Sequence, residues 1–414
     1  MATQADRLRD ALVDRLLATG MVRTRPVEMA LRAVPRHVFL PGVPARQAYA
    51  NDVTATKRDA DGTPISAASQ PSIVAAMLEQ LGIVPGDRIL EIGAGTGYNA
   101  ALLAHLAGPD GTIVTIDVDE DIVAGARAAL RAADCPDVTV VRGDGALGYA
   151  PGAPYDRIIA TVGARDVPLA WQDQLVPDGR IVLPLRLRGS VTRSIAFEWA
   201  AAPGGGRVLR SVSSEMCGFM PMRASIASDP RLTVPLTADA DVLLEVQQEQ
   251  VAAIDQHALE GVLDRERAVV WTGAKFGDAG STEWLYLWLT CTVPGGLLGL
   301  SARESALDRG LLAPMFRWGA MAAVDAGSLA YLTFGPADDA GLREVGVTGH
   351  GPHGRSLAEI LAEQIGVWCR KHRPAEPWFE IRPRPDPSGP GSAGPDGDVF
   401  TFPTPANVLV IYWH

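Results

Sequence analysis

The alternation of apolar and polar positions changes character near residue 225. Before that point, apolar strand-like runs alternate with amphipathic helix-like stretches. The expected strands are RILEIG, TIVTIDV, VTVVRGDG, YDRIIATVG and GRIVLPL, and the expected helices are SIVAAMLEQL, YNAALLAHLA, EDIVAGARAALRAA and PLAWQDQL. Alternation of this kind favours right-handed crossovers and a parallel sheet with helices on both faces. We therefore predict a doubly wound α/β domain over residues 60–225.

The first 59 residues carry a helical pattern. Leu8, Leu12, Leu16 and Leu17 recur at helical spacing within residues 4–19, and Gly20 follows as a typical residue after a helix end. Pro26 opens a second short helix, PVEMALRAV. Residues 1–59 are therefore predicted to form an N-terminal helical segment.

A different pattern follows residue 225. Strands are expected at LTVPLTADADVLLEVQQ, AVVWTGAKF, TEWLYLWLTCTV, SLAYLTFG and ANVLVIYWH, and helices near 303–322 and 355–371. The Pro/Gly-rich stretch at 382–398 is typical of a loop. We predict that residues 226–414 form a separate C-terminal α+β domain.

Composition narrows the class of protein. The 414 residues carry a net charge of −11, which argues against nucleic acid as the partner because phosphate binding favours a basic surface. No apolar run reaches the length of a membrane span, and the charged first turn lacks the apolar core of a signal peptide. The four cysteines form no C-x-x-C pair, so no metal site is indicated. We expect a cytoplasmic protein without a membrane partner.

A glycine-rich turn between the first strand of the predicted sheet and the next helix is the leading candidate for a cofactor site. Glycines let the backbone approach a ligand closely, and the helix N-terminus offers free N–H donors. The spacing is G-x-G-x-G, whereas a dinucleotide fingerprint would need its third glycine where Tyr98 stands. The candidate residues in this segment are Glu91, Gly93, Ala94, Gly95, Thr96, Gly97 and Tyr98.

Two acidic residues follow the next strands. Asp117 closes its strand where a carboxylate would reach the hydroxyls of a ribose, which NAD and S-adenosylmethionine both carry. Asp144 stands where it would accept a hydrogen bond from the amino group of adenine. The alternatives are an ordinary strand-end turn residue for Asp117 and an Asp-Gly turn without a ligand for Asp144. The neighbouring candidates are Val118, Gly143, Gly145 and Thr161.

These three segments, in this order, resemble the class I S-adenosylmethionine-dependent methyltransferases. The resemblance implies a Rossmann-like methyltransferase domain with S-adenosyl-L-methionine as its cofactor. It also implies that the glycine loop lies against the methionine part, that Asp117 binds the ribose and that Asp144 binds the adenine.

A closer resemblance is carried by AVPRHVFLP, AYAND, SQPS, PGDRILEIGAGTGY, RGDGALG, APYDRIIATVGARDVPLAWQDQL, PDGRIVLPL and EMCGFMPMR. These segments, over about residues 10–225, look like protein L-isoaspartate O-methyltransferase. That family has Ser-Ala-Pro-His before this helix, so the resemblance implies that Ser69 is the active-site serine. Ser72 departs from the family's histidine, and Ser66 is the rival assignment. A third interpretation makes Ser69 only a cap of the helix that follows.

The chemistry of carboxyl methylation suits these residues. A carboxylate is already ionised near neutral pH and needs no general base. The site must hold the carboxylate oxygen beside the methyl group and exclude water. A hydroxyl on a rigid turn, as at Ser69, would orient the carboxylate through one hydrogen bond, and small neighbours would admit a peptide backbone.

The added C-terminal part suggests recognition of a particular polypeptide. Longer relatives of the repair enzyme occur in the biosynthesis of lanthipeptides, graspetides and lasso peptides, and this chain resembles them. The resemblance implies methylation of an ordinary aspartate in a ribosomally made peptide, closure of the ester to an aspartimide, and hydrolysis to isoaspartate as a step left open. The alternatives are isoaspartate repair with an accessory domain, a small-molecule methyltransferase, and a non-enzymatic scaffold.

Overall fold

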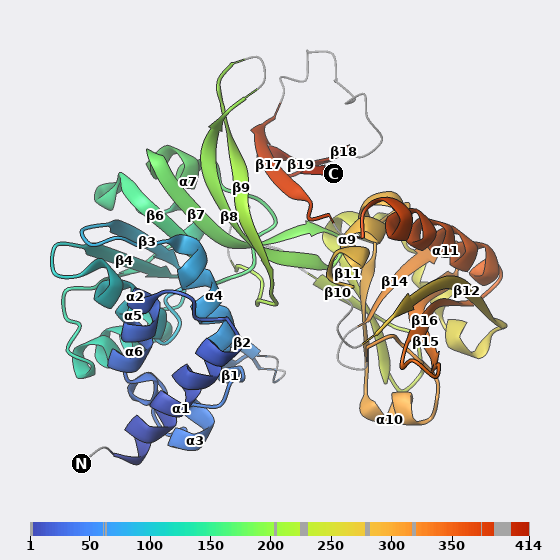
Figure 1. Ribbon diagram of the computed structural model, residues 1–414, viewed down its shortest axis with the longest axis horizontal. Helices are drawn as coiled ribbons and strands as arrows, with labels where there is room; N and C mark the ends of the chain where they lie inside the picture. The colour runs from blue at the N-terminus through green and yellow to red at the C-terminus, as the bar shows by residue number, and fades with distance from the viewer. Residues whose placement is uncertain are drawn as a thin grey trace.

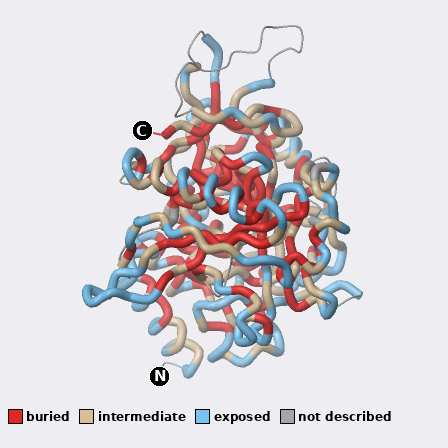
Figure 2. The backbone as a smooth tube through the Cα atoms, turned by 90° about the vertical axis from the view of Figure 1, so that its right-hand side faces the viewer, coloured by how far each residue is buried: buried red, intermediate tan, exposed pale blue. Residues whose placement is uncertain are grey.

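Two β-sheets organise the chain in this computed structural model (Figure 1). The structure describes residues 3–60, 62, 64–202, 205–223, 231–277, 282–316, 320–373, 375–384 and 399–413. Buried segments lie in the interior of the molecule, while many of the outer loops are exposed (Figure 2). Among the described helices, none is both long and apolar enough to cross a membrane.

The larger sheet joins a parallel half to an antiparallel half. Its order is β18-β19-β17-β9-β8-β7-β6-β3-β4-β5, and the neighbours from β7 to β5 are parallel. The strands are β3 (Arg88–Ile92), β4 (Thr112–Asp117), β5 (Thr139–Arg142), β6 (Tyr155–Ala160), β7 (Leu175–Arg188), β8 (Val191–Ala201), β9 (Arg207–Met216), β17 (Trp378–Pro383), β18 (Val399–Pro403) and β19 (Asn407–Tyr412). The Rossmann-like α/β fold predicted from the sequence is confirmed.

Helices cover both faces of the parallel half. α1, α2, α4, α5 and α6 share one core with alternate residues of the strands, whereas Trp171 of α7 lies in the core on the other face. The helices of this part are α1 (Gln4–Ala18), α2 (Arg25–Ala33), α3 (Ala45–Ala48), α4 (Pro71–Leu81), α5 (Tyr98–Ala107), α6 (Glu120–Ala132) and α7 (Leu169–Gln174), with short 3₁₀ turns η1 (Arg36–Phe39), η2 (Gly145–Leu147) and η3 (Ala150–Gly152). A separate hairpin, β1 (Thr54–Arg58) and β2 (Pro64–Ala68), leads into α4.

The second sheet is antiparallel throughout its described strands. Its order is β10-β11-β13-β14-β15-β16-β12, and α11 packs along β12 and β16. The strands are β10 (Arg231–Pro235), β11 (Val242–Gln247), β12 (Arg267–Phe276), β13 (Leu298–Ala302), β14 (Ala320–Asp325), β15 (Ser328–Ala337) and β16 (Arg343–His350). The helical elements are η4 (Gln248–Ala253), α8 (Gln256–Leu259), η5 (Val262–Asp264), α9 (Glu283–Thr292), α10 (Glu304–Asp308) and α11 (Gly354–Lys371).

Two predicted elements of the second part were wrong. TEWLYLWLTCTV, predicted as a strand, forms the helix α9, because an apolar run buried on almost every side carries no periodicity that separates helix from strand. The helix predicted near 303–322 is limited to α10, and β14 begins at Ala320. The helix predicted over 355–371 is confirmed as α11, and residues 385–398 of the predicted loop lie outside the described residues.

The C-terminal strands do not belong to a separate domain. β17 pairs with β9 through Glu380↔Arg210 and Ile381↔Leu209, and β19 and β18 follow at the same edge. Phe379 and Ile411 are fully buried in the core that contains Leu209. The structure therefore differs from the predicted boundary of 226–414, because the last three strands complete the sheet that begins in the first half. The segment 1–59 likewise contains β1 beside its predicted helices.

The tip of the β7–β8 hairpin joins the two sheets. The Ser190 amide donates to the Leu297 carbonyl over 2.9 Å, and the Gly299 amide donates to Ser190 Oγ over 2.7 Å. Gly189 has φ +55°, and a Cβ there would overlap the Leu297 carbonyl oxygen, so the close approach needs glycine. The second sheet is thereby held against the end of the first.

We predict that Phe379→Ala will destabilise the parallel half as well as the C-terminal strands. Truncation of a buried phenylalanine costs about 3–5 kcal/mol of unfolding free energy. Hydrogen exchange followed by mass spectrometry should show faster exchange in β3 and β6, while the exposed Ile360→Ala should change stability by about 0.5 kcal/mol or less. Unchanged exchange in β3 and β6 would mean that the C-terminal strands unfold independently.

Candidate functional site

A cavity of about 660 Å³ opens where the parallel strands β3, β4 and β6 end. The carboxyl ends of such strands are the usual ligand site of an open α/β sheet. Its walls also include the β1–β2 hairpin, the start of α4, the β7–β8 hairpin and the segment 216–223. Further lining comes from α9 and β14 of the second sheet, so both sheets build the cavity.

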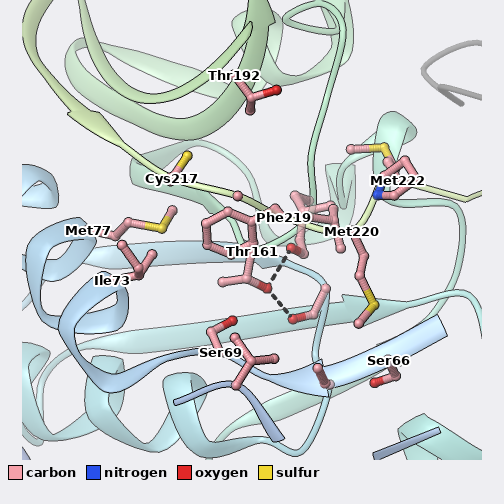
Figure 3. A pocket seen from close by; sticks show the side chains of 18 of the residues that line it. Ser66, Ser69, Ile73, Met77, Thr161, Thr192, Cys217, Phe219, Met220 and Met222 are labelled. Atoms are coloured by element: carbon pink, nitrogen blue, oxygen red, sulfur yellow. Dashed lines mark hydrogen bonds between the residues drawn. The ribbon is translucent and has the colours of Figure 1, made fainter. Parts of the chain in front are cut away.

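The glycine loop forms the floor of this cavity. Gly93 has φ +99°, and a Cβ there would lie 2.8 Å from Thr161 Oγ1. Thr161 in turn donates its hydroxyl to the Gly93 carbonyl over 2.7 Å (Figure 3). Gly97, with φ +87°, precedes α5, whose N-terminus therefore faces the loop. The backbone conformation and the close contact with Thr161 both require glycine at position 93.

Most of the predicted cofactor residues come together in the cavity wall. Those that line it are Glu91, Gly93, Ala94, Gly95, Thr96, Tyr98, Asp117, Val118, Gly145 and Thr161. Gly97, Gly143 and Asp144 are not part of the described wall. The Asp144 carboxylate accepts the Ala146 amide over 3.0 Å and so caps η2, which matches the Asp-Gly turn interpretation. Its contact with adenine stays a prediction.

Asp117 stands at the end of β4 with its carboxylate held by the backbone. Oδ2 accepts the Gly95 amide over 3.2 Å, and Oδ1 accepts the Asp119 amide over 3.3 Å. Burial raises the pKa of Asp117, while these amides oppose that rise. The carboxylate is thus held in place beside the glycine loop, and its contact with a ribose stays a prediction.

Glu91 lies behind the loop and is fully buried. It accepts hydrogen bonds from Asn99 Nδ2 over 2.8 Å and from Thr115 Oγ1 over 2.6 Å. Burial raises the pKa of Glu91 to about 7, although both hydrogen bonds favour the ionised form. This carboxyl therefore changes charge near neutral pH.

Ion pairs fasten two wall segments to the loop that follows β4. Lys57 Nζ on β1 lies 2.9 Å from Asp119 and 2.7 Å from Asp121. Arg223, at the end of the segment 216–223, lies 2.7 Å from Asp119. Because Asp119 accepts both cations, the hairpin and this segment are both fastened to the loop that follows β4.

Both candidate serines line the cavity, at separate places (Figure 3). Ser66 lies within β2, and its Oγ accepts the Thr56 hydroxyl over 3.1 Å. Ser69 follows β2 at the turn into α4, and its carbonyl accepts Arg36 Nη2 over 2.8 Å. The Ser69 hydroxyl has no partner among the described residues. Ser69 therefore presents the freer hydroxyl, on a turn anchored by a buried guanidinium.

The interpretation of Ser69 as a helix cap is wrong. α4 begins at Pro71, so Gln70 and not Ser69 occupies the N-cap position. The Gln70 side chain makes no capping hydrogen bond to the helix. Asn51, from the AYAND segment, accepts the Ser72 amide on Oδ1 over 2.9 Å. A residue distant in sequence satisfies this helix end, which leaves Ser69 available.

Sequence reasoning missed several wall residues. Thr192, Cys217 and Phe219 come from the hairpin and the segment beyond β9, and burial raises the pKa of Cys217 to about 12. Tyr286 and Met321 come from the second sheet and its helix α9. The segment EMCGFMPMR contributed to the family resemblance, but no role was assigned to its residues. No local sequence pattern marks Thr192, Tyr286 or Met321 as cavity residues.

We predict that Glu91→Gln will remove a pH-dependent part of the stability. Because burial raises the pKa from 4.5 to about 7, the contribution of this carboxyl to the unfolding free energy is full below pH 4.5. It is lost as the pH rises to about 7, and the loss is about 3 kcal/mol. Urea unfolding of both proteins from pH 4.5 to 7.5 measures this difference.

The exposed Glu363→Gln on α11 serves as the control and should show no such trend. A difference between wild type and Glu91→Gln that stays constant over this pH range would contradict the prediction.

Three comparisons with known proteins bear on this site. The family model described as protein-L-isoaspartate(D-aspartate) O-methyltransferase matches residues 7–197. A protein-L-isoaspartate O-methyltransferase of Methanopyrus kandleri is 42% identical over 180 residues, covering 43% of this chain and 77% of that protein. Protein-L-isoaspartate O-methyltransferase 1 of Rhodopseudomonas palustris is 36% identical over 244 residues, covering 57% of this chain and 93% of the relative.

The fold agrees with these matches. A solved structure named protein-L-isoaspartate O-methyltransferase superposes with a TM-score of 0.50 at 21% identity, over 90% of this chain and 96% of that one. The expected cofactor, S-adenosyl-L-methionine, is the methyl donor of the matched family. The chain belongs to the protein-L-isoaspartate O-methyltransferase family and is an S-adenosylmethionine-dependent methyltransferase.

Proposed function

We propose that this protein transfers a methyl group from S-adenosylmethionine to the free carboxylate of an isoaspartyl residue in a polypeptide. The observation that carries the proposal is that Ser69, the Gly93 loop and Asp117 line the same cavity. The cofactor's sulfonium supplies an electrophilic methyl group. The family match supports isoaspartate as the residue that presents the carboxylate.

The residues present fit a carboxylate nucleophile. The substrate is ionised at neutral pH, so the site needs no base and has only to orient and desolvate it. Ser69 would donate one hydrogen bond to the carboxylate, and Arg36 holds the Ser69 carbonyl in place. Ile73, Met77 and Phe219 would exclude water from the reacting oxygen, since all three line the cavity (Figure 3).

Positive charge on the cavity wall favours an anionic substrate. Arg36, Arg193 and Arg223 line the cavity. Arg36 is 1% exposed, makes no ion pair with a described residue, and lies 5.0 Å from the Tyr98 ring centre. Arg223 is paired with Asp119, and the carboxyl groups of Glu91 and Asp117 also line the cavity. Arg36, which bonds the Ser69 carbonyl, is therefore the cation placed to attract a carboxylate at Ser69.

A tailoring role on an ordinary aspartate of a ribosomally made peptide is the second candidate. It is favoured by Tyr286 and Met321, which extend the cavity into the second sheet, beyond residue 197 where the family match ends. The names of the matched relatives favour isoaspartate, so we rank repair of isoaspartyl polypeptides first. Closure to aspartimide would follow from the ester in either case.

Mass spectrometry of paired reactions tests the ranking. The full chain and S-adenosylmethionine would be incubated with an isoaspartyl peptide, with its aspartyl counterpart, and with a crosslinked precursor peptide encoded beside the gene. Methylation of the isoaspartyl peptide alone supports the first proposal. Methylation or loss of water on an aspartate of the precursor alone would replace it with the tailoring role.

We predict that Ser69→Ala will lower kcat by about 10-fold or more and leave the affinity for S-adenosylhomocysteine within about 2-fold. A hydrogen bond to a charged group contributes about 1.5–3 kcal/mol, and the Ser69 hydroxyl faces the substrate side. Steady-state kinetics and calorimetry give the two quantities. Ser66→Ala is the matched control, and a larger loss in that variant would transfer the role to Ser66.

We predict that Asp117→Ala will weaken S-adenosylhomocysteine binding by about 10- to 100-fold, because a preorganised carboxylate would lose its bonds to the ribose hydroxyls. Calorimetric titration measures the dissociation constant. Asp144→Ala in parallel tests the predicted adenine contact. An unchanged affinity in Asp117→Ala would remove the ribose assignment.

A further inference from the structure

Methionine is concentrated in the cavity wall. Of the nine methionines in the sequence, five are among the described residues that line it: Met77, Met216, Met220, Met222 and Met321. They come from α4, from β9 and the segment after it, and from β14. Methionine is unbranched and polarizable, and such surfaces adapt to apolar partners of different shape. The wall is therefore suited to side chains of more than one kind.

The lining residues that are most distant in sequence from the glycine loop come from the second sheet. Met321 on β14 pairs with Gly299, whose amide donates to Ser190 at the tip of the β7–β8 hairpin. Met321 is half-buried and packs against the core shared by both sheets. One strand pairing thus places Met321 beside the hairpin that carries Thr192, another lining residue.

This part of the wall carries no charge among the described lining residues. Its members on α9 and β14 are Tyr286, Leu287, Ala320 and Met321. The charged lining residues Arg36, Glu91, Asp117, Arg193 and Arg223 all belong to the first sheet and its loops. The residues that α9 and β14 add to the cavity wall are therefore uncharged, and Arg193 of β8 stacks beside them on Trp284 of α9 at 3.7 Å.

Tyr286 adds one polar group to this uncharged part of the wall. A tyrosine hydroxyl is protonated at neutral pH, and burial raises the pKa of Tyr286 further. Its hydroxyl has no hydrogen-bond partner among the described residues. A protonated phenol beside an apolar surface can donate to a peptide carbonyl while its ring packs on a side chain.

Building on the proposed function, we infer that the second sheet supplies a subsite for an apolar side chain next to the isoaspartyl residue, with Met321 and Tyr286 setting this preference. The occupant is a polypeptide because the subsite is continuous with the cavity that holds Ser69. When the substrate carboxylate lies at Ser69, the residues that flank the isoaspartyl residue in the peptide lie within the same cavity. An apolar flank buries its surface there, whereas a glycine flank leaves the subsite without a partner.

The test compares two isoaspartyl peptides that are identical except for one residue next to the isoaspartyl residue, which is leucine in one peptide and glycine in the other. The comparison is made separately for the preceding and the following position. The wild-type 414-residue chain should methylate the leucine peptide with a kcat/KM about 10-fold higher or more than the glycine peptide. Met321→Glu should remove that preference and bring the ratio of the two kcat/KM values to about 1. Equal kcat/KM values for both peptides in the wild type would overturn the subsite while leaving the proposed function standing.

Matched variants separate the subsite from folding. Met321→Leu should retain the preference for the leucine peptide. Met29→Glu changes an exposed methionine on α2 outside the described cavity wall and should alter kcat/KM for neither peptide. S-adenosylhomocysteine affinity should stay within about 2-fold in Met321→Glu. An equal loss for both peptides in Met321→Glu would make the residue structural and overturn the inference. Absence of methylation of every isoaspartyl peptide by wild type would overturn the proposed function and the subsite with it.

Discussion

The docking of the β7–β8 hairpin on the second sheet is the contact on which the cavity depends. Ser190 bonds the backbone of Leu297 and Gly299 at the start of β13, and Arg193 stacks on the Trp284 ring at 3.7 Å. Leu187 and Val191 share a core with the apolar face of α9. Because the hairpin continues the parallel sheet without a break, the second sheet is placed relative to the cofactor loop by backbone pairing. Without this contact, α9 and β14 would not reach the cavity.

The same sheet is closed by the chain's return. β9 would be an exposed edge if β17 did not pair with it, and exposed edges invite association with other chains. Glu380 is fully buried between Arg210 and Arg382, and the latter two cations hold its pKa low despite burial. In sequence, the second sheet is inserted between β9 and β17, which pair with each other in the first sheet. Anchoring at both ends restrains it more than a linker would.

Local chemistry explains what the sequence could predict. The strands and helices of the parallel half follow from periodicity, and the Gly93 loop follows from the need for close backbone approach. The fold and most loop residues in the wall were therefore accessible from the sequence alone, whereas the cofactor rested on the resemblance to methyltransferases. The assignment of Ser69 rested on a family resemblance, and its release from capping depends on Asn51, which lies 21 residues from the amide that it bonds.

Tertiary placement explains what the sequence could not predict. The apolar run of α9 is buried by α11, by the hairpin and by the C-terminal strands at once, so no polar face marks it as a helix. β17 pairs with β9 across more than a hundred and fifty residues, and no local pattern encodes such a partner. Met321 and Tyr286 enter the wall only through that arrangement.

The distribution of polar groups in the cavity bears on the breadth of its substrates. A site that selects one polypeptide needs polar groups whose partners only that polypeptide supplies, because unpaired polar groups then reject the others. Here Arg36 bonds the Ser69 carbonyl and Asp117 accepts an amide of the glycine loop, in the part of the cavity where every carboxylate substrate is alike. The remaining walls are methionine-rich and adaptable. Such a cavity recognises the carboxylate by position and a flanking side chain only by its apolar character, so many different polypeptides satisfy it, which supports the ranking of repair above tailoring.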